Sequence, residues 1–154
     1  MPITQEQEDA KHLAQANLRK EHSKYKLARL RYQRTLVSSA RTLTQNEIAR
    51  AAGISQPSVS EALSKARTLE GLREGFSSGS LYEMFLSYSA GELSKQQLIE
   101  ELSRWEYDEL STATVDGLLV DLPNTFREVE DALVKGVIEP DVYDTVVSRI
   151  KQKG

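Results

Sequence analysis

The sequence predicts an all-α protein with a long N-terminal helix, a pair of short helices and a small helical unit towards the C-terminal end. Three observations predict this class. Residues 4–40 contain no glycine or proline and are rich in strong helix formers. Ser or Thr followed three residues later by Glu or Gln, the signature of a capping box, recurs along the chain. Gly53, Gly91 and Gly136 stand where apolar-periodic runs end, as helix-terminating glycines do.

The first helix is expected over residues 4–40, which is longer than an ordinary globular helix and allows one break near His22–Ser23. Its apolar residues recur at helical spacing and predict a stripe along one face. The stripe consists of Leu18, Tyr25, Ala28 and Tyr32, and it is extended towards residues 44–67 by Leu36, Val37 and Ala40. Glu21 interrupts it, so packing against the rest of the protein is favoured over a long coiled coil with a second copy.

The segment 44–67, TQNEIARAAGISQPSVSEALSKAR, predicts two short helices joined by a tight turn. Thr44 and Glu47 form a capping box at the start of the first helix. Gly53 ends that helix in a left-handed conformation, Ser55 caps the second, and a proline lies in the first turn of the second. The apolar residues expected between the helices are Ile48, Ala52, Ile54, Val59 and Leu63. This pattern is typical of a helix-turn-helix, whose second helix enters the major groove of DNA.

The outward face of the second helix is predicted to contact bases, because its side chains are short or polar. The candidate base contacts are Gln56, Pro57, Ser58, Ser60, Glu61 and Ser64. The alternative is an αα-hairpin without a DNA role. A helix that only faced water would more often carry Glu/Lys pairs four residues apart, which favours the DNA-binding interpretation.

The segment resembles the helix-turn-helix of phage-repressor-like regulators, the Cro and Xre group, over about 25 residues. Ala49, Gly53 and Val59 occupy the positions of the family's alanine, glycine and later valine, and Gln45 and Gln56 match its two glutamines. The resemblance implies that Gln45 contacts a phosphate and supports Gln56, which reads adenine. A glutamine pairs well with the N6 and N7 edge of that base. The departure is Pro57, where the family often has serine; we expect an apolar contact there.

Charge is distributed unevenly along the chain. Residues 1–75 hold 13 Lys/Arg against 8 Asp/Glu, whereas residues 76–154 hold 7 against 15. A basic front half suits a polyanion, and an acidic back half is repelled by one. We therefore predict phosphate contacts from the front half, which add affinity and salt dependence rather than sequence choice. The predicted phosphate contacts are Gln45, Arg31, Arg34, Arg41, Lys65 and Arg67.

Residues 70–80 contain three glycines and three serines and are a candidate linker. We place the boundary there, between a DNA-binding domain of residues 1–74 and an acidic helical interaction domain of residues 75–154. Helices are expected over about 80–90, 94–106, 125–135 and 140–152, the first three begun by Ser80–Glu83, Ser94–Gln97 and Thr125–Glu128 capping boxes. Residues 115–122 predict a brief strand or a loop over the core.

The C-terminal half contains enough apolar residues at helical spacing to close a small core. The candidate core residues are Leu81, Met84, Phe85, Tyr88, Leu93, Leu98, Leu102, Trp105, Phe126, Val129, Leu133, Val137, Ile138, Val142, Tyr143, Val146, Val147 and Ile150. This half resembles an acidic helical domain attached to helix-turn-helix proteins of phages and actinobacteria, a resemblance that implies no particular activity.

Catalysis, cofactors and metal binding are not expected. The two histidines, His12 and His22, lie ten residues apart on one helix and do not converge on a metal. No phosphate-binding glycine loop or nucleophile elbow is present, and zero cysteines exclude thiolate sites. No apolar run predicts a membrane span, and the acidic N-terminus is unlike a signal peptide. We expect a location in the bacterial cytoplasm, at the nucleoid.

The leading hypothesis is a sequence-specific transcriptional repressor of the phage-immunity type, bound to double-stranded operator DNA. The alternative is an autoregulating antitoxin whose acidic half binds a protein toxin. Residues 80–154 would serve a homodimer or another protein partner in either case. A third version, extra DNA contacts from the C-terminal half, is opposed by its acidic charge. An alternative of a different class is a protein-interaction module whose helix-turn-helix is vestigial or serves recombination or partition. Absence of specific binding in a mobility-shift measurement with genomic DNA would favour it.

Overall fold

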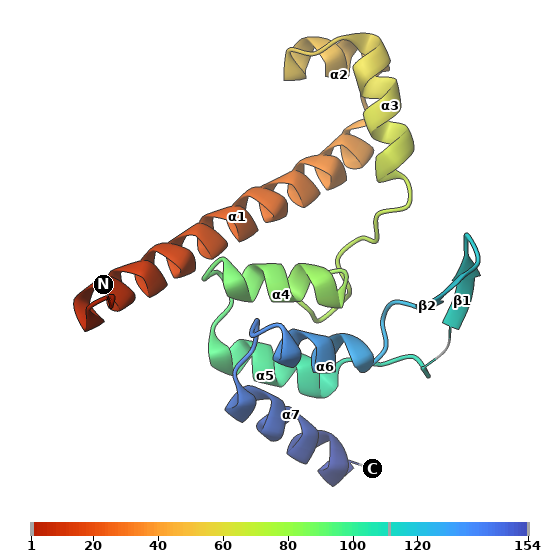
Figure 1. The fold of residues 1–154 in the computed structure, drawn as a ribbon. Helices are drawn as coiled ribbons and strands as arrows, with labels where there is room; N and C mark the ends of the chain where they lie inside the picture. Colours follow the sequence, from red (N-terminus) through yellow and green to blue (C-terminus); the bar gives the residue numbers. More distant parts are fainter. Residues whose placement is uncertain (1, 111, 154) are drawn as a thin grey trace.

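The computed structural model describes residues 2–110 and 112–153, which form seven helices and one β-hairpin. Figure 1 shows a long helix with two short helices at one end and four helices stacked beside its middle. The elements in chain order are α1 (Gln5–Ser39), α2 (Gln45–Ala52), α3 (Gln56–Ala66), α4 (Leu81–Ser89), α5 (Lys95–Arg104), β1 (Thr112–Val115), β2 (Leu118–Asp121), α6 (Arg127–Val134) and α7 (Pro140–Lys153). The predominantly helical class is therefore confirmed, with the hairpin as an addition to it.

Helix α1 is continuous over 35 residues, about 50 Å, and the break considered near His22–Ser23 is absent. Thr4 and Gln7 form a capping box at its start, and no residue within it interrupts the hydrogen-bond ladder. Ser23 is buried instead, and its hydroxyl donates to Ser89 Oγ at 2.8 Å. This contact fixes the middle of α1 against α4, where a break was expected.

The predicted packing of the apolar stripe on α1 is confirmed only at its C-terminal end, where Leu36 is buried. The side chains of Leu18 and Tyr25 are 72% and 65% exposed, and Tyr32 is also exposed. The buried apolar residues of α1 are Leu36, which belongs to the extension of the stripe, and Leu27, which is nine residues earlier and so lies on the opposite face of the helix. Leu27 packs against Leu86 of α4, and Leu36 packs against the α2–α3 pair. The two buried residues of α1 therefore contact different parts of the protein.

Helices α2 and α3 pack on the C-terminal end of α1 around a small apolar cluster. The cluster consists of Leu36, Ile48, Ala49, Val59 and Leu63, with Leu43 and Ala62 packed against it. Two of the residues expected in this core, Ala52 and Ile54, are exposed. Leu36 of α1, in contrast, is part of this cluster.

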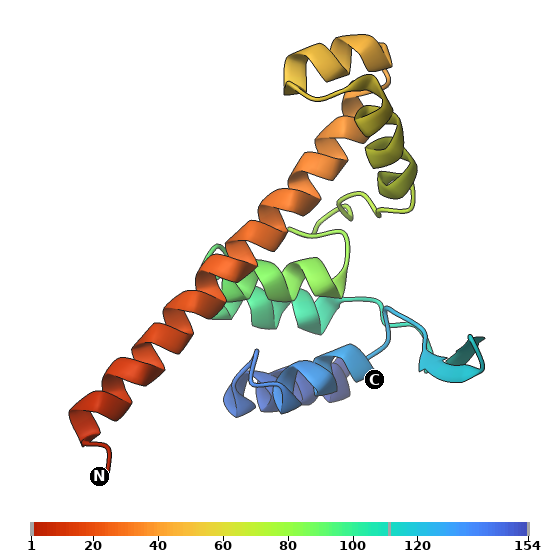
Figure 2. The ribbon, with the colours of Figure 1, turned by 45° about the horizontal axis from the view of Figure 1, so that its top comes forward.

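The C-terminal helices close one core between α4, α5, α6 and α7. The expected core residues are all buried or half-buried, as predicted. Figure 2 shows these helices grouped on one side of α1. A smaller cluster of Leu27, Leu86 and Ala90, with Leu30 against it, joins this unit to the middle of α1. The long helix thus packs on both sides of the boundary that we predicted at residues 74–75.

The helix ends follow the sequence signals only in part. Ser94 and Gln97 form the expected capping box. Ser80 accepts from the amide of Glu83, but the Glu83 carboxylate accepts from the amide of Gly79 rather than that of Ser80. The capping box predicted at Thr125 is wrong, because α6 begins later, with Phe126 at its N-cap and no side-chain cap.

The segment 67–80 is a packed connection rather than a free linker. Phe76 meets the Trp105 ring edge-on at 4.9 Å, and the guanidinium of Arg73 lies 4.1 Å from the centre of that ring. The amide and the hydroxyl of Ser77 donate to the two carboxylate oxygens of Glu101, at 2.5 and 2.8 Å. These contacts hold the segment against α5, although its composition is typical of a flexible chain.

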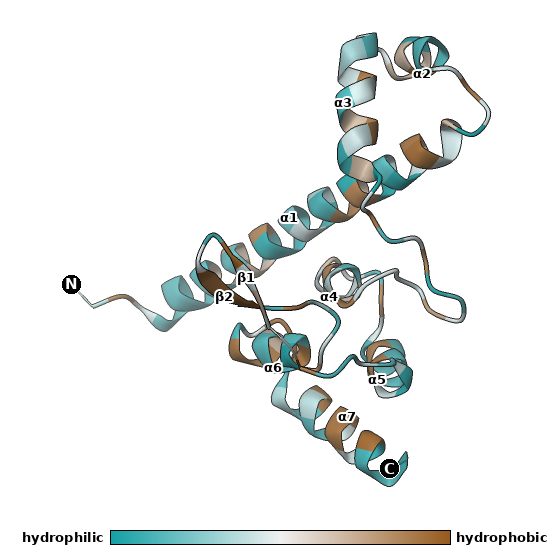
Figure 3. Ribbon diagram, turned by 90° about the vertical axis from the view of Figure 1, so that its right-hand side faces the viewer, coloured by the Kyte–Doolittle hydropathy of each residue, from teal (hydrophilic) through white to brown (hydrophobic). Residues whose placement is uncertain are grey.

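Strands β1 and β2 form an antiparallel hairpin where a strand or loop was expected. Its turn is Asp116–Gly117, both residues with positive φ, which is the geometry that an Asp-Gly hairpin turn prefers. Figures 1 and 2 show the hairpin projecting from the helical part, and β2 is among the most hydrophobic segments in Figure 3. None of the described helices has the length and apolarity needed to cross a bilayer.

Candidate nucleic-acid interface

The turn between α2 and α3 is built by local hydrogen bonds. Thr44 and Glu47 form the predicted capping box at the start of α2, and their hydrogen bonds lower the pKa of the Glu47 carboxyl. Gly53 takes φ 70° and ψ 32°, and the amide of Ile54 donates to the carbonyl of Ala49 at 3.0 Å. Ser55 then caps α3 by accepting from the amide of Ser58 at 3.2 Å. These bonds fix the direction in which α3 leaves the turn.

Helix α3 turns one face to the protein and the other to solvent. Val59, Leu63 and Ala66 are buried on α1 and α2. All of the predicted base contacts are exposed: Gln56, Pro57, Ser58, Ser60, Glu61 and Ser64. Figure 1 shows α3 at the end of the molecule away from α5, α6 and α7. The outward face is therefore accessible to a large ligand.

The two glutamines that match the phage-repressor pattern touch each other. Gln56 Nε2 donates to Gln45 Oε1 at 2.5 Å, although the residues are separated by 11 positions and lie on different helices. Gln45 is half-buried and Gln56 is exposed. Gln45 thus holds one end of the Gln56 amide, which leaves the Gln56 carbonyl oxygen and one amide hydrogen for a ligand.

Helix α3 carries one Glu/Lys ion pair of the kind that is common on helices that only face water. Lys65 Nζ lies 3.1 Å from Glu61 Oε1, and both side chains are about 70% exposed. The face therefore carries one Glu/Lys pair at the spacing typical of a solvated helix. Such an exposed pair is worth a few tenths of a kcal/mol, so a phosphate or a base edge can displace it at small cost.

The five basic residues among the predicted phosphate contacts divide into two groups. Arg41, Lys65 and Arg67 are exposed at the α2–α3 end of the molecule. Arg31 and Arg34 are bound to carboxylates of the C-terminal half instead, which does not fit their predicted role. They are basic residues close to the motif in sequence, but the rotation of α1 turns them towards α4 and the turn after it.

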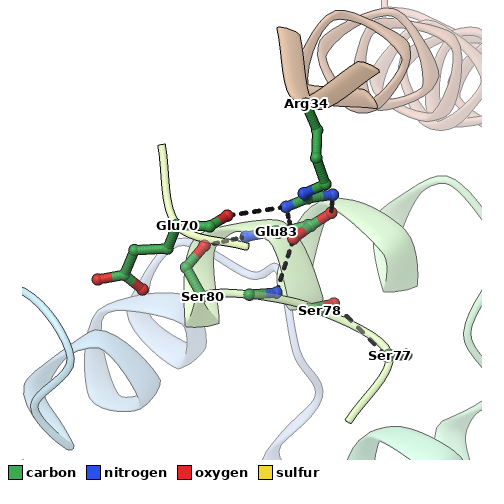
Figure 4. Close-up of polar contacts among 7 residues, drawn as sticks. Arg34, Glu70, Ser77, Ser78, Ser80 and Glu83 are labelled. Carbon is green, nitrogen blue, oxygen red and sulfur yellow. Dashed lines mark hydrogen bonds and ion pairs between the residues drawn. The ribbon is translucent and has the colours of Figure 1, made fainter. Parts of the chain in front are cut away.

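Arg34 occupies the centre of a polar site between α1 and α4 (Figure 4). Its two terminal nitrogens each donate to one carboxylate oxygen of Glu83 at 2.9 Å, and one of them also donates to the carbonyl of Glu70 at 3.1 Å. The amide of Gly79 donates to the same carboxylate at 2.7 Å. Desolvation raises the pKa of Glu83, but the hydrogen bonds from Arg34 and Gly79 outweigh it, and the pKa lies below its ordinary value.

Arg31 makes a second, more exposed contact between the same parts. Its terminal nitrogens lie 3.3 and 2.5 Å from the two carboxylate oxygens of Glu92. These hydrogen bonds lower the pKa of Glu92 and raise that of Arg31. Two arginines of α1 thus bind two glutamates of the acidic half. Part of the opposite charge of the two halves is therefore neutralised within the molecule.

Arg50 is an exposed cation that the sequence interpretation did not include. It lies in the last turn of α2, next to the turn that leads into α3. The signal that could have found it was its position within the motif, where the outward residues of the first helix run beside the DNA backbone in a helix-turn-helix. It joins Arg41, Lys65 and Arg67 as a candidate phosphate contact.

No group of three or more metal-ligating side chains converges anywhere in residues 2–110 and 112–153. The chain matches no protein-family model, no curated protein and no solved structure. The function is therefore argued from the geometry of α2, α3 and the cations around them.

Proposed function

We propose that this chain is a sequence-specific DNA-binding transcriptional repressor that places α3 in the major groove. The accessible outward face of α3 is the observation that carries the proposal. Gln56 lies at the N-terminal end of that helix, where recognition helices meet base edges. Its contact with Gln45 supports a fixed amide orientation, which a bidentate pairing with adenine requires.

Electrostatics support the same docking. Residues 41–67 carry four Lys/Arg and two Glu, and Arg41, Arg50 and Arg67 are exposed around the pair of helices. The acidic C-terminal helices lie along α1 away from α3, which keeps their repulsion of DNA small at the docking face (Figure 1). Occupancy of a promoter by such a module is sufficient to block transcription.

The test is selection of bound duplexes from a random DNA pool by the full chain, followed by a mobility-shift measurement on the recovered site. We expect one sequence motif to be enriched and to bind at least about a thousandfold more tightly than random DNA. A symmetric motif would indicate a dimer and an asymmetric one a monomer. Recovery without any enriched motif, or equal affinity for all duplexes, would refute the proposal.

The antitoxin alternative shares this DNA-binding step, so the selection experiment tests the step for both hypotheses. They differ in the partner of residues 80–154. The repressor hypothesis needs only occupancy of the operator, whereas an antitoxin must also neutralise a toxin. Growth rescue on co-expression with a candidate toxin from a neighbouring gene would separate the two.

A further inference from the structure

The β-hairpin carries an apolar face that the rest of the described chain leaves uncovered. Opposite residues of an antiparallel pair point to the same side, so the register of the two strands places Ala113, Val115, Leu118 and Val120 on one face. Val115, Leu118 and Val120 are 53%, 70% and 46% exposed. The other face alternates two threonines with Leu119 and Asp121. Three exposed apolar residues therefore share one face, whereas the other face has a single one, Leu119, which is 77% exposed.

A two-stranded hairpin is marginally stable in water without a third strand or a helix against it. Among the described elements, the close packing of β1 and β2 is with each other. A third strand added at an edge would leave the apolar face in water. The apolar face is removed from solvent only by an element that packs across it. An amphipathic helix is the element that usually covers the face of a sheet.

Charge indicates what kind of helix fits. Between Trp105 and Arg127 the sequence has no Lys or Arg, and it has five acidic residues: Glu106, Asp108, Glu109, Asp116 and Asp121. Asp116 stands in the turn between Val115 and Leu118, whereas Asp121 lies on the other face and is paired with Arg127 at 3.9 Å. A second copy would bring the same carboxylates together, and an anionic lipid surface would repel them. A basic partner complements them.

We propose that the apolar face of this hairpin is the docking surface for a basic amphipathic helix of a partner protein. The helix lays its apolar stripe on Val115, Leu118 and Val120, and its Lys or Arg residues approach Asp116 in the turn between them. The surface lies away from α3 in Figure 1, so docking leaves the DNA-binding face open. The proposal goes beyond DNA binding, and its test uses no DNA, so either can fail without the other.

The probe is a synthetic helix of about 18 residues with Leu on one face and Lys on the other, and its twin has Glu in place of Lys. Binding to the full chain is measured by fluorescence anisotropy. The test variant is Leu118→Thr with Val120→Thr, and the matched control is Leu119→Thr on the opposite face. Threonine keeps strand propensity, so the hairpin itself is retained. Unchanged circular dichroism and thermal midpoints verify that the helical core is intact.

We expect the Leu/Lys helix to bind the parent chain and the Leu119→Thr chain with similar Kd, and to bind the double variant at least about tenfold more weakly. Added salt should weaken the binding, and the Leu/Glu twin should not bind. Absence of binding, or equal binding to the double variant, overturns the proposal. Sedimentation or vesicle flotation that reveals self-association or lipid binding lost in the double variant also overturns it, because the occupant is then a second copy or a membrane.

Discussion

Arg34 and Glu83 lie 49 positions apart in the sequence and are joined by two parallel hydrogen bonds of 2.9 Å. The Glu83 side chain is only 5% exposed and that of Arg34 25%. Glu83 also accepts from the amide of Gly79, and Arg34 donates to the carbonyl of Glu70. One ion pair therefore ties three parts together: the long helix, the segment after α3 and the first C-terminal helix.

Replacing Glu83 with Gln should destabilise the protein by about 2 kcal/mol, because it leaves the Arg34 guanidinium in a mostly buried site without its counter-charge. The full penalty of a buried unpaired charge is reduced here by the partial exposure of Arg34. The measurement is the free energy of unfolding in urea at neutral pH. Glu92→Gln, which breaks the exposed pair with Arg31, is the matched control and should cost about 0.5 kcal/mol or less. Equal losses of unfolding free energy in the two variants would show that the Arg34–Glu83 pair contributes no more to stability than the exposed Arg31–Glu92 pair.

The same carboxylate predicts a pH dependence. The folded protein holds the pKa of Glu83 below its ordinary value of 4.5, since its hydrogen bonds favour the ionised form. Its contribution to stability is therefore present above that value and is lost as the pH falls through the lower pKa of the folded state. The stability difference between the parent chain and Glu83→Gln should shrink as the pH is lowered below about 4.5. A difference that grows with acid would contradict the assignment.

Gln56→Ala should lower the affinity for the selected DNA site by about 1–3 kcal/mol and relax the preference at one base pair. Gln45→Ala should relax the same position to a smaller degree, because Gln45 holds the amide of Gln56. The losses of the double variant should therefore be less than the sum of the single ones. Affinities are measured on the selected site and on its single-base substitutions. If Gln56→Ala weakens binding equally on every sequence, Gln56 does not read a base.

Arg67→Ala should weaken DNA binding on every sequence alike and reduce the slope of log affinity against log salt by about one unit. Arg31→Ala is the matched control, because Arg31 is bound to Glu92. It should leave the slope unchanged. Titrations at several salt concentrations compare the two variants with the parent. A reduced slope for Arg31→Ala would mean that its ion pair opens on DNA.

The local features of the fold could be predicted from sequence because their determinants are short-range. The capping boxes at Thr44 and Ser94 and the left-handed Gly53 depend on residues within one helical turn. The core of α4 to α7 followed from apolar spacing, which reports the buried face of each helix. The hairpin could also have been predicted from the sequence, because Asp116–Gly117 between apolar residues is a strong local turn signal. We predicted a single strand or a loop there instead.

The partners of α1 could not be predicted, because they depend on packing between distant segments. Leu18 and Tyr25 of the predicted stripe are exposed and its extension at Leu36 is covered by the α2–α3 pair, whereas α4 covers Leu27 on the opposite face of α1. Arg31 and Arg34, which we predicted as phosphate contacts, lie on the same side of α1 as Leu27 and form ion pairs with Glu92 and Glu83. The prediction of a linker at residues 70–80 was wrong for a related reason. The glycine and serine content does not reveal the contact of Phe76 with Trp105, which lies far along the chain.

Gly79→Ala and Gly53→Ala should destabilise the protein for different physical reasons. An added Cβ at Gly79 would stand 2.3 Å from the carbonyl oxygen of Gly71, so the backbone must move, at a cost of about 1–3 kcal/mol. An added Cβ at Gly53 meets nothing within 4 Å, and the cost is that of a non-glycine residue at φ 70°, about 1 kcal/mol.

Urea unfolding of the single variants and of each combined with Glu83→Gln distinguishes the two causes. The movement at Gly79 displaces the amide that donates to Glu83, so the losses of Gly79→Ala and Glu83→Gln should not add. Gly53 ends α2 and shares no hydrogen-bond partner with this site, so the loss from Gly53→Ala should add to that from Glu83→Gln within about 0.5 kcal/mol. Strict additivity for Gly79→Ala as well would mean that the segment after α3 and the Arg34–Glu83 pair are energetically independent.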